Sequence, residues 1–363
     1  MKIVTVVGAR PQFVKAAAVS RAIRTEFAGD VQEILVHTGQ HYDKNMSGVF
    51  FDELEISKPD YNLEISGGQH GVMTGRMLEG VEKVLLQEKP DCLLIYGDTN
   101  STLAGALAAA KLHIPVAHIE AGLRSFNMRM PEEINRILSD RVSSLLFCPT
   151  ETAVKNLAAE GLHAGVHNVG DVMYDVALFY REKARKQSNA MEKYGLREKE
   201  FALATCHRAE NTDDPGKLEG ILSGLAAVAE AMPVLLPLHP RTRKLANDHH
   251  LGAHLGRLIV IEPLPFLDMV ALEQAAQLIF TDSGGVQKEA FFFQVPCITM
   301  RDETEWVETV SSGWNCLVGS DSARIRETFN NVLQRPSVRQ NVTPYGNGDA
   351  ASKILACMLK SLG

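Results

Sequence analysis

The chain has 363 residues, of which 45% are hydrophobic and 22% charged, as is ordinary for a soluble globular protein of about two domains. Its net charge of -7 argues against general affinity for nucleic acid or for anionic membranes. No uncharged apolar segment approaches the ~20 residues that span a bilayer, and the N-terminus enters a strand directly, so we expect no signal peptide. Six scattered cysteines without a Cys-x-x-Cys pair favour a reduced, cytoplasmic protein with no structural zinc.

Short apolar runs alternate with helical patterns in the first half of the chain. We predict strands at 2–7, 34–38, 91–96, 116–119 and 145–148, with a further strand at Val169. Helical spacing covers 12–25, 70–88, 100–111 and 132–142. This alternation is typical of a parallel sheet covered by helices.

A charged stretch over 181–200 lacks strong apolar periodicity, and we place a domain boundary there. The alternation then restarts, with strands at 201–205, 234–238, 258–261, 278–281, 297–300 and 316–318. We therefore predict an α/β protein of two Rossmann-like parallel-sheet domains, 1–180 and 181–345, that face each other across a cleft. The remaining segment, 346–363, reads as an amphipathic helix that packs back on the N-terminal domain.

Polar clusters fall at the predicted carboxyl ends of the strands, where open parallel sheets bind ligands. The clusters are 8–10, 38–41, 97–100, 120–124, 207–211, 239–243 and 283–285. Two sheets facing across a cleft would bring these clusters together, so the pattern predicts a shared binding site.

The stretch 278–290 predicts a phosphate receptor. An apolar strand stops at Ser283, Gly284 and Gly285, and a helix follows. The start of a helix presents unpaired N–H groups and the positive end of the helix dipole, and glycines let a ligand approach the backbone. Glu289 lies one turn further on and suits the hydroxyls of a ribose, so a nucleoside diphosphate fits. The alternative is a turn whose glycines serve only tight packing.

Three carboxylates are candidates for acid–base chemistry. Asp98 and Glu120 close adjacent predicted strands, and Glu132 opens the next helix. Carboxylates that cluster in a site without water would differ in pKa, so that one could act as an acid while another acts as a base. Purely structural roles are the alternatives: Asp98 suits a helix cap, and Glu132 or Glu133 suits a helix start.

Basic residues provide candidate anion ligands. Arg10 and Lys15 flank the start of the first helix, where cations oppose the helix dipole unless an anion binds between them. A solvated basic turn is the alternative. His207 follows a strand and could donate to a phosphate or act as an acid, whereas its neighbour Cys206 points to the opposite face. His239 follows another strand and suits a phosphate or a second ligand. Gly-x-Gly-x-x-Gly is absent from the sequence, which weighs against a bound NAD.

Several segments together resemble one family, the non-hydrolysing UDP-N-acetylglucosamine 2-epimerases. They are Gly8-Ala9-Arg10-Pro11, Gly97-Asp98-Thr99, 118–124, Pro131-Glu132-Glu133-Ile134-Asn135-Arg136, 207–211, 281–289, Met300-Arg301-Asp302 and Pro344-Tyr345-Gly346. They run in the family's order and cover essentially the whole chain.

The resemblance implies the glycosyltransferase-B architecture, a cytosolic homodimer, and neither metal nor nicotinamide cofactor. It carries catalytic roles onto Asp98, Glu120, Glu132 and His207, with Arg136 supporting the acidic cluster. The candidate substrate- and UDP-binding residues are Arg10, Lys15, Gln40, His41, Arg124, Arg129, Arg136, His239, Ser283, Gly284, Gly285 and Glu289.

The segment 125–130, with 39–43 and 291–293, is more similar to the branch that acts on UDP-2,3-diacetamido-2,3-dideoxy-glucuronate, which supplies mannuronate units for surface polysaccharide. Arg129 is our candidate partner for the C6 carboxylate of that sugar. UDP-N-acetylglucosamine is the alternative substrate. A glycosyltransferase of the same architecture, a hydrolysing epimerase and a non-catalytic nucleotide-sugar-binding protein remain open.

The expected chemistry follows from the weak acidity of C2, which has no adjacent carbonyl. A base takes the C2 proton while UDP leaves C1, which gives a bound glycal. UDP then adds back with a proton delivered to the opposite face.

Overall fold

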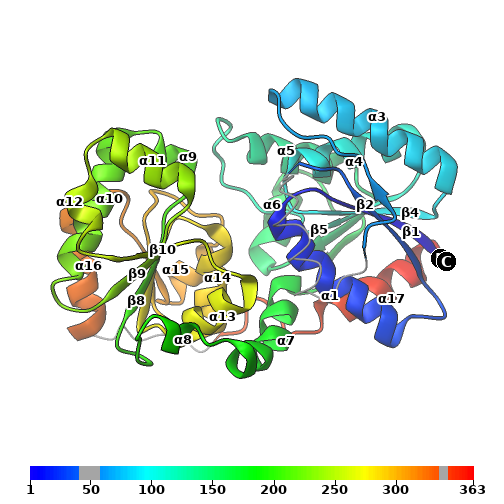
Figure 1. Cartoon of the computed structure of the whole chain (residues 1–363). Coiled ribbons are helices and arrows are strands. Elements are labelled where there is room, and N and C mark those ends of the chain that lie inside the picture. The colour runs from blue at the N-terminus through cyan, green and yellow to red at the C-terminus, as the bar shows by residue number, and fades with distance from the viewer. Residues whose placement is uncertain (41–57, 335–341) are drawn as a thin grey trace. The chain divides into compact units, whose positions relative to one another are not determined.

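A computed structural model of the chain describes residues 1–40, 58–334 and 342–363 (Figure 1). His41, a predicted substrate ligand, lies outside the described residues. The chain divides into two compact units. Unit 1 comprises Met1–Leu178 and Thr343–Gly363, and unit 2 comprises Phe179–Val342.

Unit 1 is built on a parallel sheet whose strands occur in the order β3-β2-β1-β4-β5-β6-β7. Its strands are β1 (Lys2–Val7), β2 (Gln32–His37), β3 (Tyr61–Asn62), β4 (Cys92–Tyr96), β5 (Val116–Ile119), β6 (Leu145–Cys148) and β7 (Val166–Asn168). Every residue of β4, β5 and β6 is buried, because helices cover both faces of the sheet. These strands therefore appear in the sequence as continuous apolar runs.

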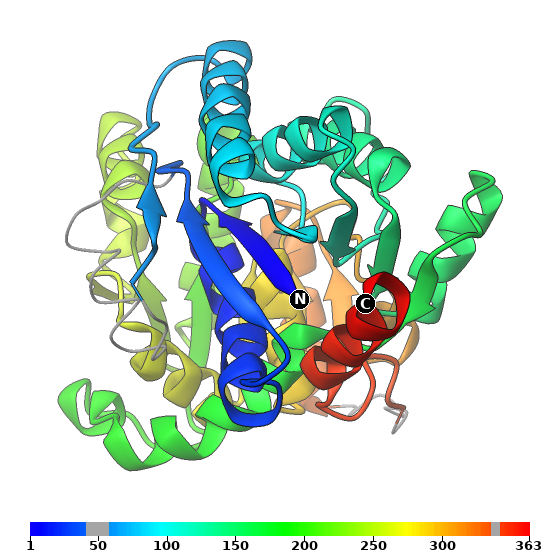
Figure 2. The same cartoon turned by 90° about the vertical axis from the view of Figure 1, so that its right-hand side faces the viewer.

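The helices of unit 1 include the C-terminal one. They are α1 (Arg10–Glu26), α3 (His70–Glu88), α4 (Asn100–Lys111), α5 (Pro131–Val142), α6 (Glu151–Ala159), the first part of α7 (Val172–Gln187) and α17 (Ala350–Leu362). Helix α17 lies beside α1 (Figure 2), and Ser352 Oγ donates to Glu26 at 2.8 Å. The backbone N–H of Ala351 at the start of α17 donates to Asp175 at 2.8 Å. Helix α17 therefore belongs to unit 1.

Unit 2 repeats the architecture with the strand order β10-β9-β8-β11-β12-β13, again parallel. Its strands are β8 (Ala202–Thr205), β9 (Val234–Pro237), β10 (Ile259–Ile261), β11 (Leu278–Thr281), β12 (Cys297–Thr299) and β13 (Asn315–Leu317). Its helices are the rest of α7, α8 (Ala190–Lys193), α9 (Ala209–Thr212), α10 (Pro215–Val228), α11 (Pro240–Asp248), α12 (Gly252–Leu255), α13 (Phe266–Ala275), α14 (Gly284–Phe292), α15 (Val307–Ser311) and α16 (Ser322–Gln334). Two Rossmann-like parallel-sheet units in one chain confirm the predicted fold class.

The charged stretch 181–200 is more regular than its composition suggests. Helix α7 runs to Gln187 and α8 follows it, and the division between the units falls inside α7, after Leu178. In the unit 2 half, Tyr180 packs edge-on against Phe266 and Ala184 is fully buried. So short an apolar face gives almost no periodic signal, which is why the sequence shows charge there and little else.

Across the described part of the chain, no helix is long and apolar enough to cross a membrane.

Candidate active site

Each sheet reverses its strand order at one point, and open α/β sheets bind ligands beyond the carboxyl ends of the strands at such points. In unit 1 the reversal lies between β1 and β4, and in unit 2 it lies between β8 and β11. The loops that follow these four strands begin at Gly8, Gly97, Cys206 and Asp282. Most of the predicted polar clusters lie on or beside these loops.

Gln12 ties the first turn of α1 to the end of β4. Its Oε1 accepts the backbone N–H of Gly8 at 2.8 Å and of Ala9 at 3.0 Å. Its Nε2 donates to the carbonyl of Tyr96 at 2.8 Å. Sequence reasoning missed Gln12, although a glutamine at the third helical position is a capping-box signal.

Glu120 lies directly beyond β5 and forms an ion pair with Lys15 of α1, and both side chains are about nine-tenths buried or more. The backbone at Glu120 has φ +72°, a left-handed conformation that residues other than glycine seldom adopt. Phe147 holds that backbone by accepting the Glu120 N–H at 3.1 Å. A Cβ at Gly97 would lie 3.2 Å from Glu120 Oε2 and 3.3 Å from Lys15 Nζ, so glycine leaves room for the pair. Backbone strain of this kind clusters at active sites.

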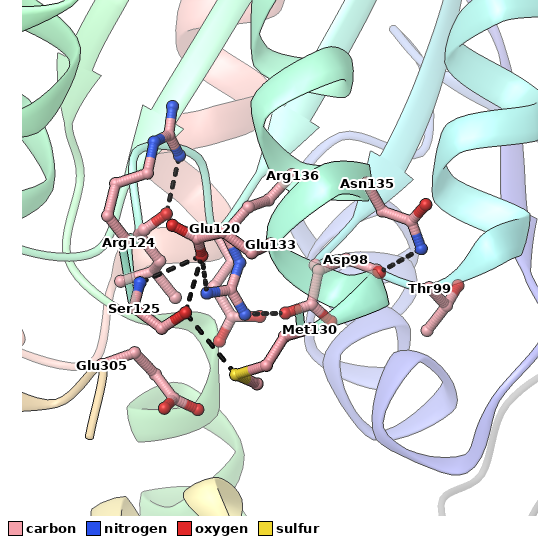
Figure 3. Close-up of polar contacts among 12 residues, drawn as sticks. Asp98, Thr99, Glu120, Arg124, Ser125, Met130, Glu133, Asn135, Arg136 and Glu305 are labelled. Atoms are coloured by element: carbon pink, nitrogen blue, oxygen red, sulfur yellow. Dashed lines mark hydrogen bonds and ion pairs between the residues drawn. The ribbon is translucent and has the colours of Figure 1, made fainter. Parts of the chain in front are cut away.

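Asp98 follows β4 and forms an ion pair with Arg136 of α5 (Figure 3). The other end of the Arg136 guanidinium donates to Glu133 at 2.7 Å. Asn135 donates to the Asp98 carbonyl at 2.9 Å, so both the backbone and the side chain of Asp98 are held from α5. Arg136 thus links Asp98 and Glu133, and its support of a catalytic acidic cluster stays a prediction.

Glu133 is buried and anchors the segment that precedes α5. Its carboxylate accepts the backbone N–H of Ser125 at 3.0 Å and the hydroxyl of Ser125 at 3.0 Å (Figure 3). It also accepts the N–H of Phe126 at 2.9 Å. A simple helix-start role, which the sequence left open for Glu133, does not describe these contacts. Glu132, the predicted catalytic residue, lies exposed in the same turn.

Four other predicted ligands of unit 1 differ in their surroundings. Arg124 is buried, and its guanidinium donates to Asp140 at 2.8 Å and to Glu160 at 2.6 Å. Arg129 is exposed, and Gln40 accepts the hydroxyl of Ser101 at 2.8 Å. Arg10 is half-buried at the start of α1. Their roles in binding substrate remain predictions.

Asp282 organises the corresponding loops of unit 2. It is fully buried after β11 and accepts the backbone N–H groups of His207 and Arg208, each at 3.0 Å. The Asn211 amide also donates to it at 3.3 Å. The His207 ring is half exposed, with Nδ1 3.5 Å from an Asp282 oxygen. Sequence reasoning missed Asp282, whose signal was a carboxylate next to a buried strand.

Cys206 is a buried, inert thiol, because desolvation raises its pKa well above the ordinary value. Its side chain belongs to the apolar core on one face of the unit 2 sheet. A nucleophilic role for this cysteine is therefore disfavoured, as the sequence indicated.

The start of α14 lies where the sequence predicts an anion receptor, and that role stays a prediction. Ser283 is its N-cap, and Gly284 and Gly285 are its first two residues. Gly284 is buried, and a Cβ there would lie 2.7 Å from Glu305 Oε1, whereas the Gly285 backbone is exposed. Glu289 lies one turn further on and is half-buried. By contrast His239 is exposed at the start of α11, where its Nδ1 accepts the Arg241 N–H at 3.2 Å.

The two units therefore carry different chemistry. Unit 1 offers carboxylates beside cations, which suits proton transfer, and unit 2 offers a helix N-terminus and a histidine, which suit a phosphate. Within residues 1–40, 58–334 and 342–363, no three His, Cys, Asp or Glu side chains are grouped to hold a metal ion. The expectation of a metal-free enzyme stays a prediction.

A family model described as UDP-N-acetylglucosamine 2-epimerase matches residues 24–359. The chain belongs to this family. It is 54% identical to the UDP-2,3-diacetamido-2,3-dideoxy-D-glucuronate 2-epimerase of Pseudomonas aeruginosa, over 99% of this chain and 100% of that protein. It is 42% identical to the UDP-N-acetylglucosamine 2-epimerase of Methanocaldococcus jannaschii, over 98% of each chain.

Solved structures of the epimerase family have the same fold. A crystal structure of the Methanocaldococcus jannaschii UDP-GlcNAc 2-epimerase in complex with UDP-GlcNAc and UDP has a TM-score of 0.90 and 40% identity, covering 99% of this chain and 100% of that one. The family resemblance and the isomerase class predicted from the sequence are confirmed.

Proposed function

We propose that this epimerase inverts C2 of UDP-2,3-diacetamido-2,3-dideoxy-glucuronate and yields the mannuronate epimer for surface polysaccharide. One observation carries the proposal. In this member of the family, the side chains suited to acid–base chemistry and to phosphate binding lie where each sheet reverses its strand order. Carboxylates paired with cations lie at the reversal of unit 1, and a glycine-started helix beside a histidine lies at that of unit 2.

Inversion at C2 requires one group that removes a proton and another that delivers one to the opposite face. A carboxylate takes the C2 proton, the C1–O bond breaks, and its electron pair leaves on the diphosphate of UDP. In the return step a diphosphate oxygen attacks C1 while C2 receives a proton on its other face. Asp98, Glu120 and Glu132 supply the acid and base. His207, Ser283 and Gly284 stabilise the charge that develops on UDP, a contribution of about 3 to 4 kcal/mol per well-placed donor.

Two observations support the diacetamido-uronate as substrate. The 54% identity to the Pseudomonas aeruginosa enzyme exceeds the 42% identity to the Methanocaldococcus jannaschii UDP-N-acetylglucosamine enzyme. Arg129 is exposed on the segment that Glu133 anchors beside Asp98, where it is free to meet a C6 carboxylate. UDP-N-acetylglucosamine is the second candidate.

Proton NMR in deuterated water tests the proposal. We expect the purified protein to convert the diacetamido-glucuronate faster than UDP-N-acetylglucosamine, with deuterium at C2 of the recovered product. Product without deuterium would exclude the elimination route. Release of free sugar with UDP would instead indicate a hydrolysing enzyme, transfer only to an added acceptor would indicate a glycosyltransferase, and binding without turnover would indicate a regulator.

A substitution of Arg129 tests the substrate assignment separately. Arg129→Met removes the proposed partner of the C6 carboxylate, so we expect about a 10- to 100-fold loss of kcat/KM for the uronate. Turnover of UDP-N-acetylglucosamine should be unchanged. Arg326→Met, an exposed arginine of α16 in unit 2, is the matched control. A variant with unaltered selectivity would contradict this role of Arg129.

We further propose that the enzyme is a cytosolic homodimer. Exposed apolar side chains on two helices of unit 1 support a second copy as the partner, namely Val72 and Leu86 of α3 and Ile134 and Leu138 of α5. Light scattering that returns the mass of one chain at micromolar concentration would contradict the dimer.

A further inference from the structure

His118 is a fully buried histidine with a defined partner at each ring nitrogen. It lies in β5, paired in register with Ile95 of β4 and Leu146 of β6. Its Nδ1 lies 2.7 Å from a carboxylate oxygen of Asp140 on α5. Its Nε2 lies 2.7 Å from the backbone carbonyl of Gly97. Neither side chain of the His118–Asp140 pair is accessible to solvent.

These partners constrain which hydrogen bonds the ring can donate. A carbonyl oxygen accepts hydrogen bonds and cannot donate one, and an ionised carboxylate also only accepts. With Asp140 ionised, both nitrogens of His118 are placed to donate, which is the hydrogen-bond pattern of a doubly protonated ring. Burial alone would raise the pKa of Asp140, but hydrogen bonds and charges from His118 and Arg124 outweigh burial and hold that pKa below its usual range.

The pair joins the two loops that carry the acid–base candidates. Gly97, whose carbonyl receives the Nε2 proton, immediately precedes Asp98. Asp140 accepts the backbone N–H of Gly122 at 3.1 Å, two residues beyond Glu120. Gly122 has φ +80°, and a Cβ there would collide with the Ala153 carbonyl, so this loop has little freedom. One buried ring thus holds the backbone beside Asp98 directly and the backbone beside Glu120 through Asp140.

Stability is a poor explanation for such an arrangement. Arg124 also donates to Asp140, at 2.8 Å, and its other side pairs with Glu160. Buried ion pairs repay their desolvation only with good geometry, and apolar residues of similar volume often stabilise as well or better. Such groups are retained in some proteins because their geometry specifies one arrangement. Here the buried pair would specify the geometry of the two loops that carry Asp98 and Glu120.

We propose that His118, held as a buried imidazolium, is the positioning residue that sets the Asp98 and Glu120 loops in register for proton transfer at C2. The proposal rests on the proposed epimerase function. His118 does not touch the substrate and acts through Gly97 and Asp140. Displacement of a reacting group by about 1 Å can cost roughly 100-fold in rate.

Kinetics of two variants test the positioning role. His118→Gln retains one donor and loses the second, and Asp140→Asn removes the charge that holds the ring. We expect each to lower kcat by about 10- to 100-fold while KM and the affinity for UDP stay within about three-fold, because the UDP residues of unit 2 are untouched. His167→Gln, on β7 of the same sheet, is the matched control and should retain full activity. Unchanged kcat in both variants would overturn the proposal, as would parallel losses of kcat and UDP affinity.

The charge of the ring has a readout that does not depend on turnover. In protein labelled with ¹⁵N-histidine, the signal that Asp140→Asn shifts should show both ring nitrogens protonated in the unaltered enzyme under the conditions of the kinetic assay. A ring with one unprotonated nitrogen there would overturn the imidazolium. Where His118→Gln fails to fold, Asp140→Asn and this spectrum decide. Failure of every UDP-sugar to epimerise would instead count against the proposed function, because the spectrum would be unaffected.

Discussion

Glu120 combines two features that each cost free energy. Its backbone adopts a left-handed conformation, and its carboxylate is buried against Lys15 beside a glycine that leaves room for both. A left-handed conformation at a residue other than glycine costs on the order of 1 to 3 kcal/mol. At the scale of single residues, this position therefore carries the greatest weight in the proposed acid–base assignment.

Glu120→Gln keeps the size of the side chain and removes its ability to exchange a proton. We expect kcat to fall by about 100- to 10,000-fold, the range typical of lost general acid–base catalysis. UDP affinity, measured by calorimetry, should be unchanged. Glu79→Gln, on the exposed surface of α3, is the control and should keep full activity. Retained epimerisation by Glu120→Gln would remove this residue from the catalytic set.

At the scale of elements, the carboxylate of Asp282 connects the start of α14 with the segment 206–211. Asp282 joins the end of β11 to the backbone of His207 and Arg208, and Ser283 follows it as the N-cap of α14. The placement of His207 is therefore set by the neighbouring strand as well as by its own.

Asp282→Asn tests this dependence. An asparagine presents an NH2 group to backbone N–H donors, and an unsatisfied buried donor costs about 1 to 3 kcal/mol. We expect the dissociation constant for UDP to rise by about 10-fold or more, since 1.4 kcal/mol corresponds to a factor of ten. Asp248→Asn, at the exposed end of α11, should bind UDP normally. Equal affinities for the two variants would contradict the supporting role of Asp282.

At the scale of the whole molecule, the last helix closes unit 1 over a long sequence separation. Asp175 of α7 accepts the first N–H groups of α17, from Ala350 at 3.2 Å and Ala351 at 2.8 Å. Burial raises the pKa of Asp175 to about 6 even though these hydrogen bonds oppose the rise. The unfolded pKa of an aspartate is about 3.9. A raised folded pKa means that the stability this group contributes is present at low pH and is lost as pH rises through about 6.

Thermal unfolding at two pH values checks that sign. Between about pH 7.5 and about pH 5, protonation of Asp175 should add roughly 1 kcal/mol to the unfolding free energy. The Tm of the wild type relative to Asp175→Asn should therefore be about 2 to 4 °C higher at the lower pH than at the higher one. A difference that is independent of pH would show that Asp175 has an ordinary pKa.

The sequence by itself determined the alternation of strands and helices, the two parallel sheets and the strand ends that carry polar residues. These features depend on the local sequence pattern, because apolar runs separated by turn residues can be recognised along the chain, as at 278–285. The family motifs fall at the same ends. The helical content of 181–200 could not be predicted from the sequence, because only Ala184 and Ala190 are buried there among many charged residues.

Only the tertiary structure decided which side chains meet. The partners of His118 and Asp282 come from other elements and loops, and nothing in the local pattern of a histidine or carboxylate names a partner tens of residues away. The left-handed backbone at Glu120 likewise depends on its neighbours in the sheet. Side-chain pairing across a parallel sheet is set by register and helix placement, and both become fixed when the cores of the units pack.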